Sequence, residues 1–200
     1  YYIMTIGTFL LLLIFPSMFE TTQANFVYLV KSLLFIPFDI GGGILQPLMR
    51  IGWTINCEIF FYLLFFLSFR ISHRFRGFIC SAFLGIIVLA NLLIPIDFAP
   101  LQFYGDSVML EFILGILCYY IAWWFHDKWH TTNTKCQYAI SLLCILITAT
   151  AFTILVITKS TINILGFRRF LFWGIPAMIM VLCTFIVGLT FKMPKWIVFL

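Results

Sequence analysis

Two glutamates lie inside segments of this chain that are otherwise almost wholly apolar. Eleven of the fifteen residues in GWTINCEIFFYLLFF, residues 52–66, are apolar or aromatic, yet Glu58 stands near the middle. Glu111 lies in a second apolar segment. An ionisable side chain inside a membrane costs about 2.5–3.5 kcal/mol on insertion scales, so each acid is a candidate functional residue. The alternative is a structural pairing with a donor on a neighbouring helix.

The elements that carry these acids are predicted to be transmembrane helices. The chain has 200 residues, of which 64% are hydrophobic and 10% charged, whereas soluble domains have about 45–50% apolar and about 25% charged residues. The hydrophobic residues fall into blocks of about 20, the length that crosses a bilayer as a helix. We therefore expect an all-α, polytopic transmembrane helix bundle. The six predicted spans are Tyr1–Phe19, Trp53–Phe69, Gly77–Pro95, Ser107–Phe125, Gln137–Thr158 and Phe172–Phe191.

Two further hydrophobic segments, Phe26–Ile51 and Ile162–Phe170, are broken by Pro, Gly or charged residues. A lipid-exposed helix does not tolerate such breaks, so we interpret both segments as interfacial or re-entrant. No linker or repeat divides the chain, which predicts a single membrane domain over residues 1–200. The chain opens without Met or a basic leader and closes at the start of another apolar run. We expect both termini to be truncated and the chain to be the central part of a longer protein.

Alternation of the spans places both acids near the same face of the membrane. Glu58 lies five residues from Trp53, and Glu111 lies four residues from Ser107, so both carboxylates are expected roughly 6–8 Å below that face. Lys and Arg number seven on the opposite side and five on this side, which favours RISHRFRG as cytoplasmic and DFAPLQFYGD as external. Two acids at matched depth predict one shared, water-accessible cavity.

Cationic and aromatic side chains are predicted on the same face. Arg168 and Arg169 directly precede the last predicted span, and a guanidinium makes paired hydrogen bonds to phosphate or carboxylate. They are candidates for binding an anionic group or for pairing with one of the acids, although anchoring the helix at the interface is an equal alternative. Trp53 and Tyr62 offer an apolar face with a polar edge, which suits stacking on a sugar ring or simple interfacial packing.

No metal site is predicted from the cysteines and histidines. The six cysteines show no CxxC pair and no zinc-like spacing with histidine, and we interpret them as small, mostly buried apolar residues. His126 and His130 in HDKWH are four residues apart, but the segment lacks the Glu of an HExxH motif and lies at a predicted membrane boundary.

The Glu58 segment resembles the Trp-(Ser/Thr)-x-x-x-Glu-x-x-Phe-Tyr signature of the acyltransferase-3 family, the integral membrane O-acyltransferases that modify bacterial polysaccharides. The matching residues are Trp53, Thr54, Glu58, Phe61 and Tyr62. The form with Gly before Trp is most similar to the branch associated with exopolysaccharide production. Three further stretches, SLLFIPFD, SVMLEFILGILCYY and FRRFLFWGIPAMIMV, resemble that branch in the same order, so the resemblance covers most of the chain.

This resemblance implies a protein of about ten transmembrane helices in the bacterial inner (cytoplasmic) membrane. It implies transfer of an acyl group, such as acetyl, from acyl-CoA to a hydroxyl of a polysaccharide or a lipid-linked sugar. Acyl-CoA (acetyl-CoA) is then a donor substrate rather than a bound cofactor, and the other expected partners are membrane lipid and the sugar acceptor, not nucleic acid. The family's essential His belongs to a first helix that this sequence does not show, so this fragment alone is expected to be inactive. None of His73, His126 and His130 stands in that motif.

Acyl transfer to a hydroxyl needs a base for the hydroxyl proton and donors for the developing oxyanion. Glu58 and Glu111 are the catalytic candidates, because each could orient the missing His, hold acceptor hydroxyls or fix the helix packing. Two other classes remain open: a transporter or flippase of lipid-linked sugar or polysaccharide with buried carboxylates, and a structural membrane subunit. A transporter should show an internal hydropathy repeat, which this sequence lacks. The substrate-binding candidates are Trp53, Tyr62, Arg168 and Arg169.

Overall fold

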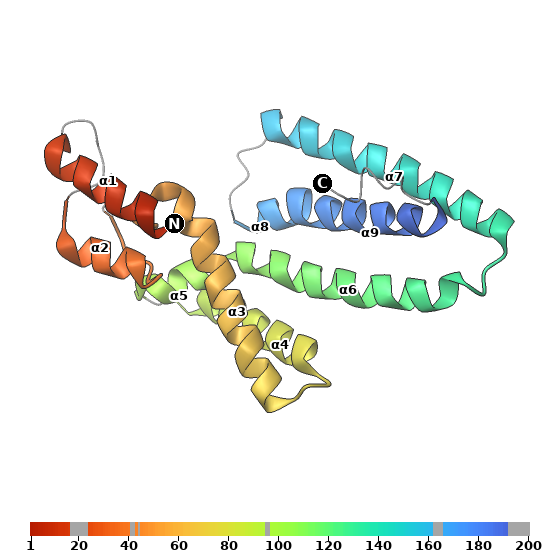
Figure 1. Ribbon diagram of the computed structural model, residues 1–200, viewed down its shortest axis with the longest axis horizontal. Coiled ribbons are helices and arrows are strands. Elements are labelled where there is room, and N and C mark those ends of the chain that lie inside the picture. The colour runs from red at the N-terminus through yellow and green to blue at the C-terminus, as the bar shows by residue number, and fades with distance from the viewer. Residues whose placement is uncertain (17–23, 41–42, 44, 95–96, 162–165, 192–200) are drawn as a thin grey trace. The chain divides into compact units, whose positions relative to one another are not determined.

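The computed structural model consists of helices and the turns that join them (Figure 1). It describes residues 1–16, 24–40, 43, 45–94, 97–161 and 166–191. Within those ranges the β pairing is limited to an isolated bridge between Asp39 and Leu45. The chain forms two compact units, Tyr1–Met109 and Leu110–Leu200. The predicted all-α class is confirmed.

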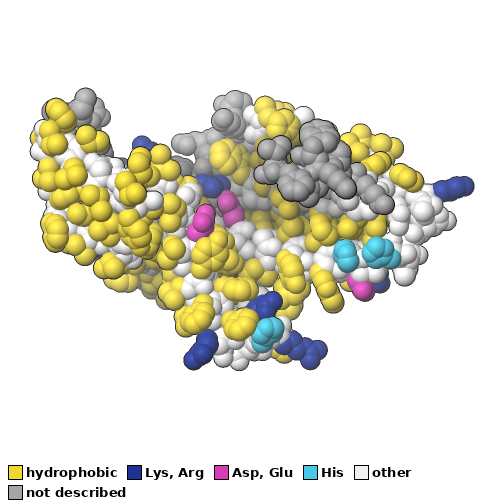
Figure 2. Space-filling model, in the orientation of Figure 1, with side chains coloured by type: hydrophobic (Ala, Val, Ile, Leu, Met, Phe, Trp, Pro, Cys, Tyr) yellow, Lys and Arg dark blue, Asp and Glu magenta, His cyan; other side chains and the backbone are white. Residues whose placement is uncertain are grey.

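Five helices in the described part of the chain are long and apolar enough to cross a bilayer. Each overlaps a predicted span. Figure 2 shows hydrophobic side chains over much of the visible face. Because such helices satisfy their own backbone hydrogen bonds in lipid, the protein fits a multi-pass membrane protein. The five helical segments are Arg50–Ile71, Arg76–Leu93, Ser107–Trp129, Thr134–Thr158 and Phe167–Thr190.

The first predicted span, Tyr1–Phe19, begins with a shorter helix, α1, at Tyr2–Ile14. At about 1.5 Å per residue, these 13 residues extend about 20 Å, which is less than a hydrocarbon core of about 30 Å. Residues 17–23 lie outside the described part of the chain. The sixth span therefore stays a prediction.

In the unit Tyr1–Met109, α3 packs along α4, and α2 packs against α1. A buried cluster of Leu12, Leu29 and Leu48 joins α1 and α2 to the segment that leads into α3. In the described part of the segment predicted to be interfacial or re-entrant, the helical elements are the eight-residue α2 and a 3₁₀ turn that begins at Arg50. The bounds are α2 Phe26–Leu33, the 3₁₀ turn Arg50–Gly52, α3 Trp53–Ile71, α4 Arg76–Leu93, α5 Ala99–Tyr104 and a second 3₁₀ turn Ser107–Met109.

A short helix, α5, occupies the stretch DFAPLQFYGD, which was predicted only as an external loop. Pro100 stands in its first turn, where a helix has backbone N–H groups without intrahelical partners. The residue that follows α5, Gly105, packs against Asn91 of α4. The Asn91 side-chain amide also donates a hydrogen bond of 3.1 Å to the Gly105 carbonyl. The turn that follows α5 is therefore bound to α4 by both packing and a hydrogen bond.

In the unit Leu110–Leu200, α9 lies between α6 and α7 (Figure 1). Its core is the cluster Trp129, Cys144, Cys183 and Ile186. The Gln137 side chain donates a hydrogen bond of 2.8 Å to the Trp129 carbonyl and so closes the turn between α6 and α7. The bounds are α6 Leu110–Trp129, α7 Thr134–Thr161, α8 Phe167–Arg169 and α9 Ile175–Thr190.

The last spanning helix begins earlier than predicted. α8 continues through a π-helical turn, Phe170–Gly174, into α9. The boundary predicted at Phe172 is therefore wrong, and Arg168 and Arg169 belong to the first turn of the spanning helix. A π turn holds an extra residue, which rotates the residues before it relative to those after it. The π turn thus contributes to the direction in which the two arginines point.

Candidate functional site

The residues of the Glu58 signature divide between two faces of α3. A helix advances about 100° per residue, so Thr54, Glu58 and Tyr62, at intervals of four, follow one face. All three of these side chains are exposed. Asn56 and Cys57 are buried on the other side of the helix. The helix therefore presents a carboxylate, a hydroxyl and an aromatic ring outward and uses its opposite side for packing.

Close packing around Gly52 fixes the start of α3. A Cβ at this position would lie 2.5 Å from Cε2 of Tyr1, so a larger residue would displace that ring. The Tyr1 hydroxyl donates a hydrogen bond of 3.0 Å to the Ser32 carbonyl. The Leu48 N–H donates a hydrogen bond of 2.8 Å to the buried Ser32 hydroxyl. The Gly before Trp in the signature thus has a packing reason, because it lets α1 meet the first turn of α3.

Glu58 projects from this fixed helix with an exposed side chain. Among the residues that the structure describes, no hydrogen bond or ion pair reaches its carboxylate. A carboxylate directed at hydrocarbon is costly, so this face of α3 has to meet water, a substrate or further protein. Trp53, at the start of the same helix, is partly buried.

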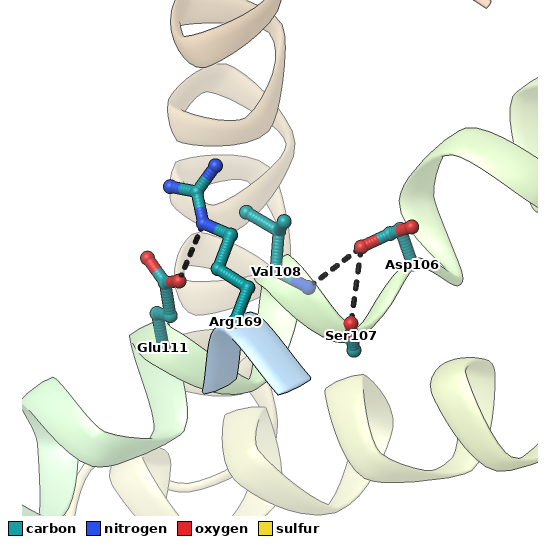
Figure 3. Close-up of polar contacts among 5 residues, drawn as sticks. All are labelled: Asp106, Ser107, Val108, Glu111 and Arg169. Atoms are coloured by element: carbon teal, nitrogen blue, oxygen red, sulfur yellow. Dashed lines mark hydrogen bonds and ion pairs between the residues drawn. The ribbon is translucent and has the colours of Figure 1, made fainter. Parts of the chain in front are cut away.

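Glu111 forms an ion pair with Arg169 (Figure 3). Arg169 Nε donates a hydrogen bond of 3.0 Å to Glu111 Oε1, and the two side chains are 28% and 31% exposed. Glu111 stands in the first turn of α6, and Arg169 ends α8. The pair therefore joins the starts of two spanning helices. The predicted pairing of an arginine with one of the two acids is present in the structure.

The surroundings of this pair are tightly packed. A Cβ on Gly174, in the π turn, would lie 3.4 Å from Glu111 Cγ and 3.3 Å from Leu114 Cδ1. The Arg169 guanidinium lies 5.9 Å from the centre of the Trp173 ring, within the range of a cation–π interaction. The Trp173 indole nitrogen is buried and has no hydrogen-bond partner in the described part of the chain. The ion pair, the close packing at Gly174 and the Trp173 ring together restrict the positions of the Glu111 and Arg169 side chains.

The other predicted site residues either form no ion pair with these two side chains in the described part of the chain or belong to the other compact unit. Arg168 is exposed, and it forms no ion pair with any described residue. Glu58 and Glu111 belong to different compact units, so their shared cavity stays a prediction. The Glu111–Arg169 contact is compatible with a structural pairing between the two helices and with an arginine held in place to bind an anionic group.

The described histidines lie far from the acids within each unit. His126 follows Glu111 by 15 residues in α6, which corresponds to about 22 Å along the helix. His73 follows Glu58 by 15 residues and lies beyond the end of α3 at Ile71. The His126 and His130 rings lie 5.6 Å apart, centre to centre. In the described ranges, no group of three or more His, Cys, Asp or Glu side chains could hold a metal ion. These histidines are therefore poorly placed to act with either acid of their own unit.

Asn56 is a buried polar residue of α3 that was not among the predicted site residues. Its side chain is fully buried in α3, and neither its amide nitrogen nor its amide oxygen has a hydrogen-bond partner within the described residues. A buried amide without partners costs about 1–3 kcal/mol in protein mutational data. An Asn inside a predicted span was the available signal, because polar residues at membrane depth are expensive.

The fold and the site define an all-α, multi-pass membrane protein that carries acids in two of its spanning helices and pairs one of them with an arginine. Over 105 residues the chain is 29% identical to the exopolysaccharide production protein ExoZ of Rhizobium meliloti (strain 1021). The match covers 52% of this chain and 32% of that protein, so it spans about a third of the relative's length. No family model matches the chain. No solved structure matches it either.

Proposed function

We propose that this chain is the central part of a membrane-bound acyltransferase of the bacterial inner membrane. The enzyme moves an acyl group, acetyl in the simplest case, from acyl-CoA to a hydroxyl of a cell-surface or exported polysaccharide. The observation that carries the proposal is the acyltransferase-3-like signature on α3, whose Thr54, Glu58 and Tyr62 follow one exposed face. The similarity to ExoZ, an exopolysaccharide production protein, supports the choice of acceptor.

The exposed face of α3 suits a sugar acceptor. Glu58 and Tyr62 are four residues apart, which places them about 6 Å apart along the helix axis. A carboxylate accepts hydrogen bonds from hydroxyls, and an aromatic ring packs against the apolar face of a sugar. In this proposal Glu58 holds the acceptor hydroxyl or orients the base that deprotonates it. His73 lies beyond the far end of α3, which ends at Ile71, and is not that base.

Arg169 has a complementary part in the proposal. Its pairing with Glu111 at 3.0 Å fixes the direction of a guanidinium, a group whose fork geometry suits phosphate. A lipid-linked sugar carries its phosphate beside the membrane surface, where α8 begins the last span. Glu111 would then act through Arg169 by holding it in place, and Arg168 would add a second positive charge.

The test replaces Glu58 in the full-length protein and measures the acyl content of the exported polysaccharide. Glu58→Gln keeps the shape and removes the charge. Loss of one charged hydrogen bond, about 1.5–3 kcal/mol, lowers the rate roughly 10- to 150-fold if that bond acts only in the transition state. Asp127→Asn is the matched control, because Asp127 is an exposed acid near the far end of α6 and should leave acylation unchanged.

The level of protein in the membrane and the total yield of polysaccharide complete the experiment. Normal acylation in Glu58→Gln contradicts a catalytic role for the carboxylate. Normal acylation in Glu58→Leu as well would show that the acid is not needed. Loss of exported polysaccharide, with normal acylation of what remains, would favour the transporter.

A further inference from the structure

Tyr104 connects three separate parts of the unit Tyr1–Met109. Its hydroxyl donates a hydrogen bond of 2.6 Å to the Phe35 carbonyl, in the loop after α2. Its ring stacks on Phe60 of α3, with ring centres 4.0 Å apart and planes 11° from parallel. Tyr104 is the last residue of α5, and the next residue, Gly105, is fastened to Asn91 of α4. It is therefore held from three directions.

The Phe35 end of this connection is itself under constraint. Phe35 has φ +57°, in the left-handed region, where a bulky side chain is strained and persists only when its surroundings hold it. Its carbonyl is the acceptor for Tyr104. Its ring stacks on Tyr1, with ring centres 5.0 Å apart. These two contacts hold the loop in this conformation.

Together these contacts form a ring of interactions that begins and ends on α3. The Tyr104 hydroxyl is hydrogen-bonded to the Phe35 carbonyl, the Phe35 ring stacks on Tyr1, and Tyr1 packs against Gly52 at the start of α3. The path returns from α3 to Tyr104 through Phe60. Two attachment points on one rigid helix, at Gly52 and Phe60, limit both its sliding and its rotation.

Glu58 lies between these two attachment points and on a different face from Phe60. Phe60 follows Glu58 by two positions, which is a rotation of about 200°, so the aromatic path supports α3 from behind the exposed face. Burial raises the pKa of the Tyr104 hydroxyl above its usual value. The hydroxyl therefore keeps the proton that it donates to Phe35.

We propose that Tyr104 is a positioning residue that sets the depth and rotation of α3 and, through them, the position of Glu58. The effect on acylation rests on the proposed function above, whereas the effect on α3 does not. Tyr104 need not touch substrate for this role. It acts through Phe60 and Phe35.

The test compares Tyr104→Phe with Tyr104→Leu in the full-length protein. Tyr104→Phe keeps the stacked ring and loses the hydroxyl, and Tyr104→Leu loses both contacts. Cys57, which is 4% exposed and adjacent to Glu58, reports the position of α3 through its rate of labelling by a membrane-permeant maleimide. All other cysteines are replaced by Ala. Tyr138→Phe, which removes an exposed tyrosine hydroxyl in α7, is the matched control.

We expect Cys57 labelling to accelerate on the order of tenfold in Tyr104→Phe, the effect of losing one buried hydrogen bond, and further in Tyr104→Leu. Acylation should fall in the same order at equal protein abundance, and Tyr138→Phe should match the wild type in both readouts. Unchanged Cys57 labelling in both Tyr104 variants overturns the proposal.

The interpretation of the acylation measurement depends on the result for Glu58→Gln. If Glu58→Gln abolishes acylation but a faster-labelling Tyr104 variant acylates normally, the link from Tyr104 to Glu58 is wrong. If Glu58→Gln acylates normally, the proposed function has failed, and Cys57 labelling still decides whether Tyr104 positions α3.

Discussion

The Glu111–Arg169 pair allows a quantitative prediction, because its two partners can be removed separately and together. The 3.0 Å contact is a charge-assisted hydrogen bond, and both side chains are about a third exposed. Fully exposed pairs contribute about 0–1 kcal/mol, whereas hydrogen bonds to charged groups contribute about 1.5–3 kcal/mol. For this partly buried pair we expect a coupling free energy of about 1.5–2 kcal/mol.

The assay is a double-mutant cycle on the full-length protein. The variants are Glu111→Gln, Arg169→Gln and the double replacement, and the free energy of unfolding is measured in detergent micelles by titration with a denaturing detergent. Each single replacement should destabilise by about 2 kcal/mol, since it leaves the other member without its charged partner. The double replacement should cost little more than either single one. The difference from additivity is the coupling free energy.

A coupling free energy below about 0.5 kcal/mol, the usual scatter of independent sites, would refute the pairing. The exchanged pair, Glu111→Arg with Arg169→Glu, then separates the two roles of this contact. If it recovers both stability and acylation, the contact is a fastening between α6 and α8. If it recovers stability alone, acylation requires an arginine at position 169.

Two further replacements probe the packing of α3 by the same unfolding measurement. Gly52→Ala should destabilise by about 1–3 kcal/mol, because its Cβ would meet the Tyr1 ring at 2.5 Å, whereas Gly85→Ala, where nothing lies within 4 Å, should be neutral or stabilise by up to about 1 kcal/mol; equal stability of the two variants would contradict the close approach of α1. Asn56→Leu should stabilise by about 1–3 kcal/mol, because it removes a buried amide that has no partner among the described residues; a loss of stability would show that the amide is satisfied.

The spanning helices could be predicted because long apolar blocks have few structural solutions in a bilayer. α3 begins at Trp53 as expected, and each of the five long helices matches an expected block. The start of the last helix could not be predicted. The sequence around Arg168 and Arg169 looks interfacial, and only the π turn shows how two charged residues are included in a spanning helix.

The Glu111–Arg169 contact could be predicted as a pairing of an acid with an arginine, but not as this particular pair. The positions of the charged residues predicted that an arginine near the membrane face could pair with an acid. The sequence spacing did not indicate whether that acid is Glu111 or Glu58. That choice depends on the packing of α6 against the helix that carries Arg169, including the absence of a Cβ at Gly174. Tyr104 was missed for a related reason, because its partners Phe35 and Phe60 are distant in sequence and α5 gives too short a signal.

Within each unit, the acids and the described histidines lie toward opposite ends of the helices, which bears on the proposed acyl transfer through the predicted orientation. Glu58 and Glu111 lie near the starts of α3 and α6; His126 lies about 22 Å along α6 from Glu111, and His73 lies just beyond the end of α3 at Ile71. On the predicted orientation, the acids face the exterior and the histidines face the cytoplasm, where acyl-CoA is found. In the proposed enzyme, a carboxylate at the exterior end meets the acceptor hydroxyl rather than the CoA thioester. The acyl group then has to cross most of the hydrocarbon core before transfer, so an apolar passage for it, lined by helices, is a necessary part of the proposed enzyme.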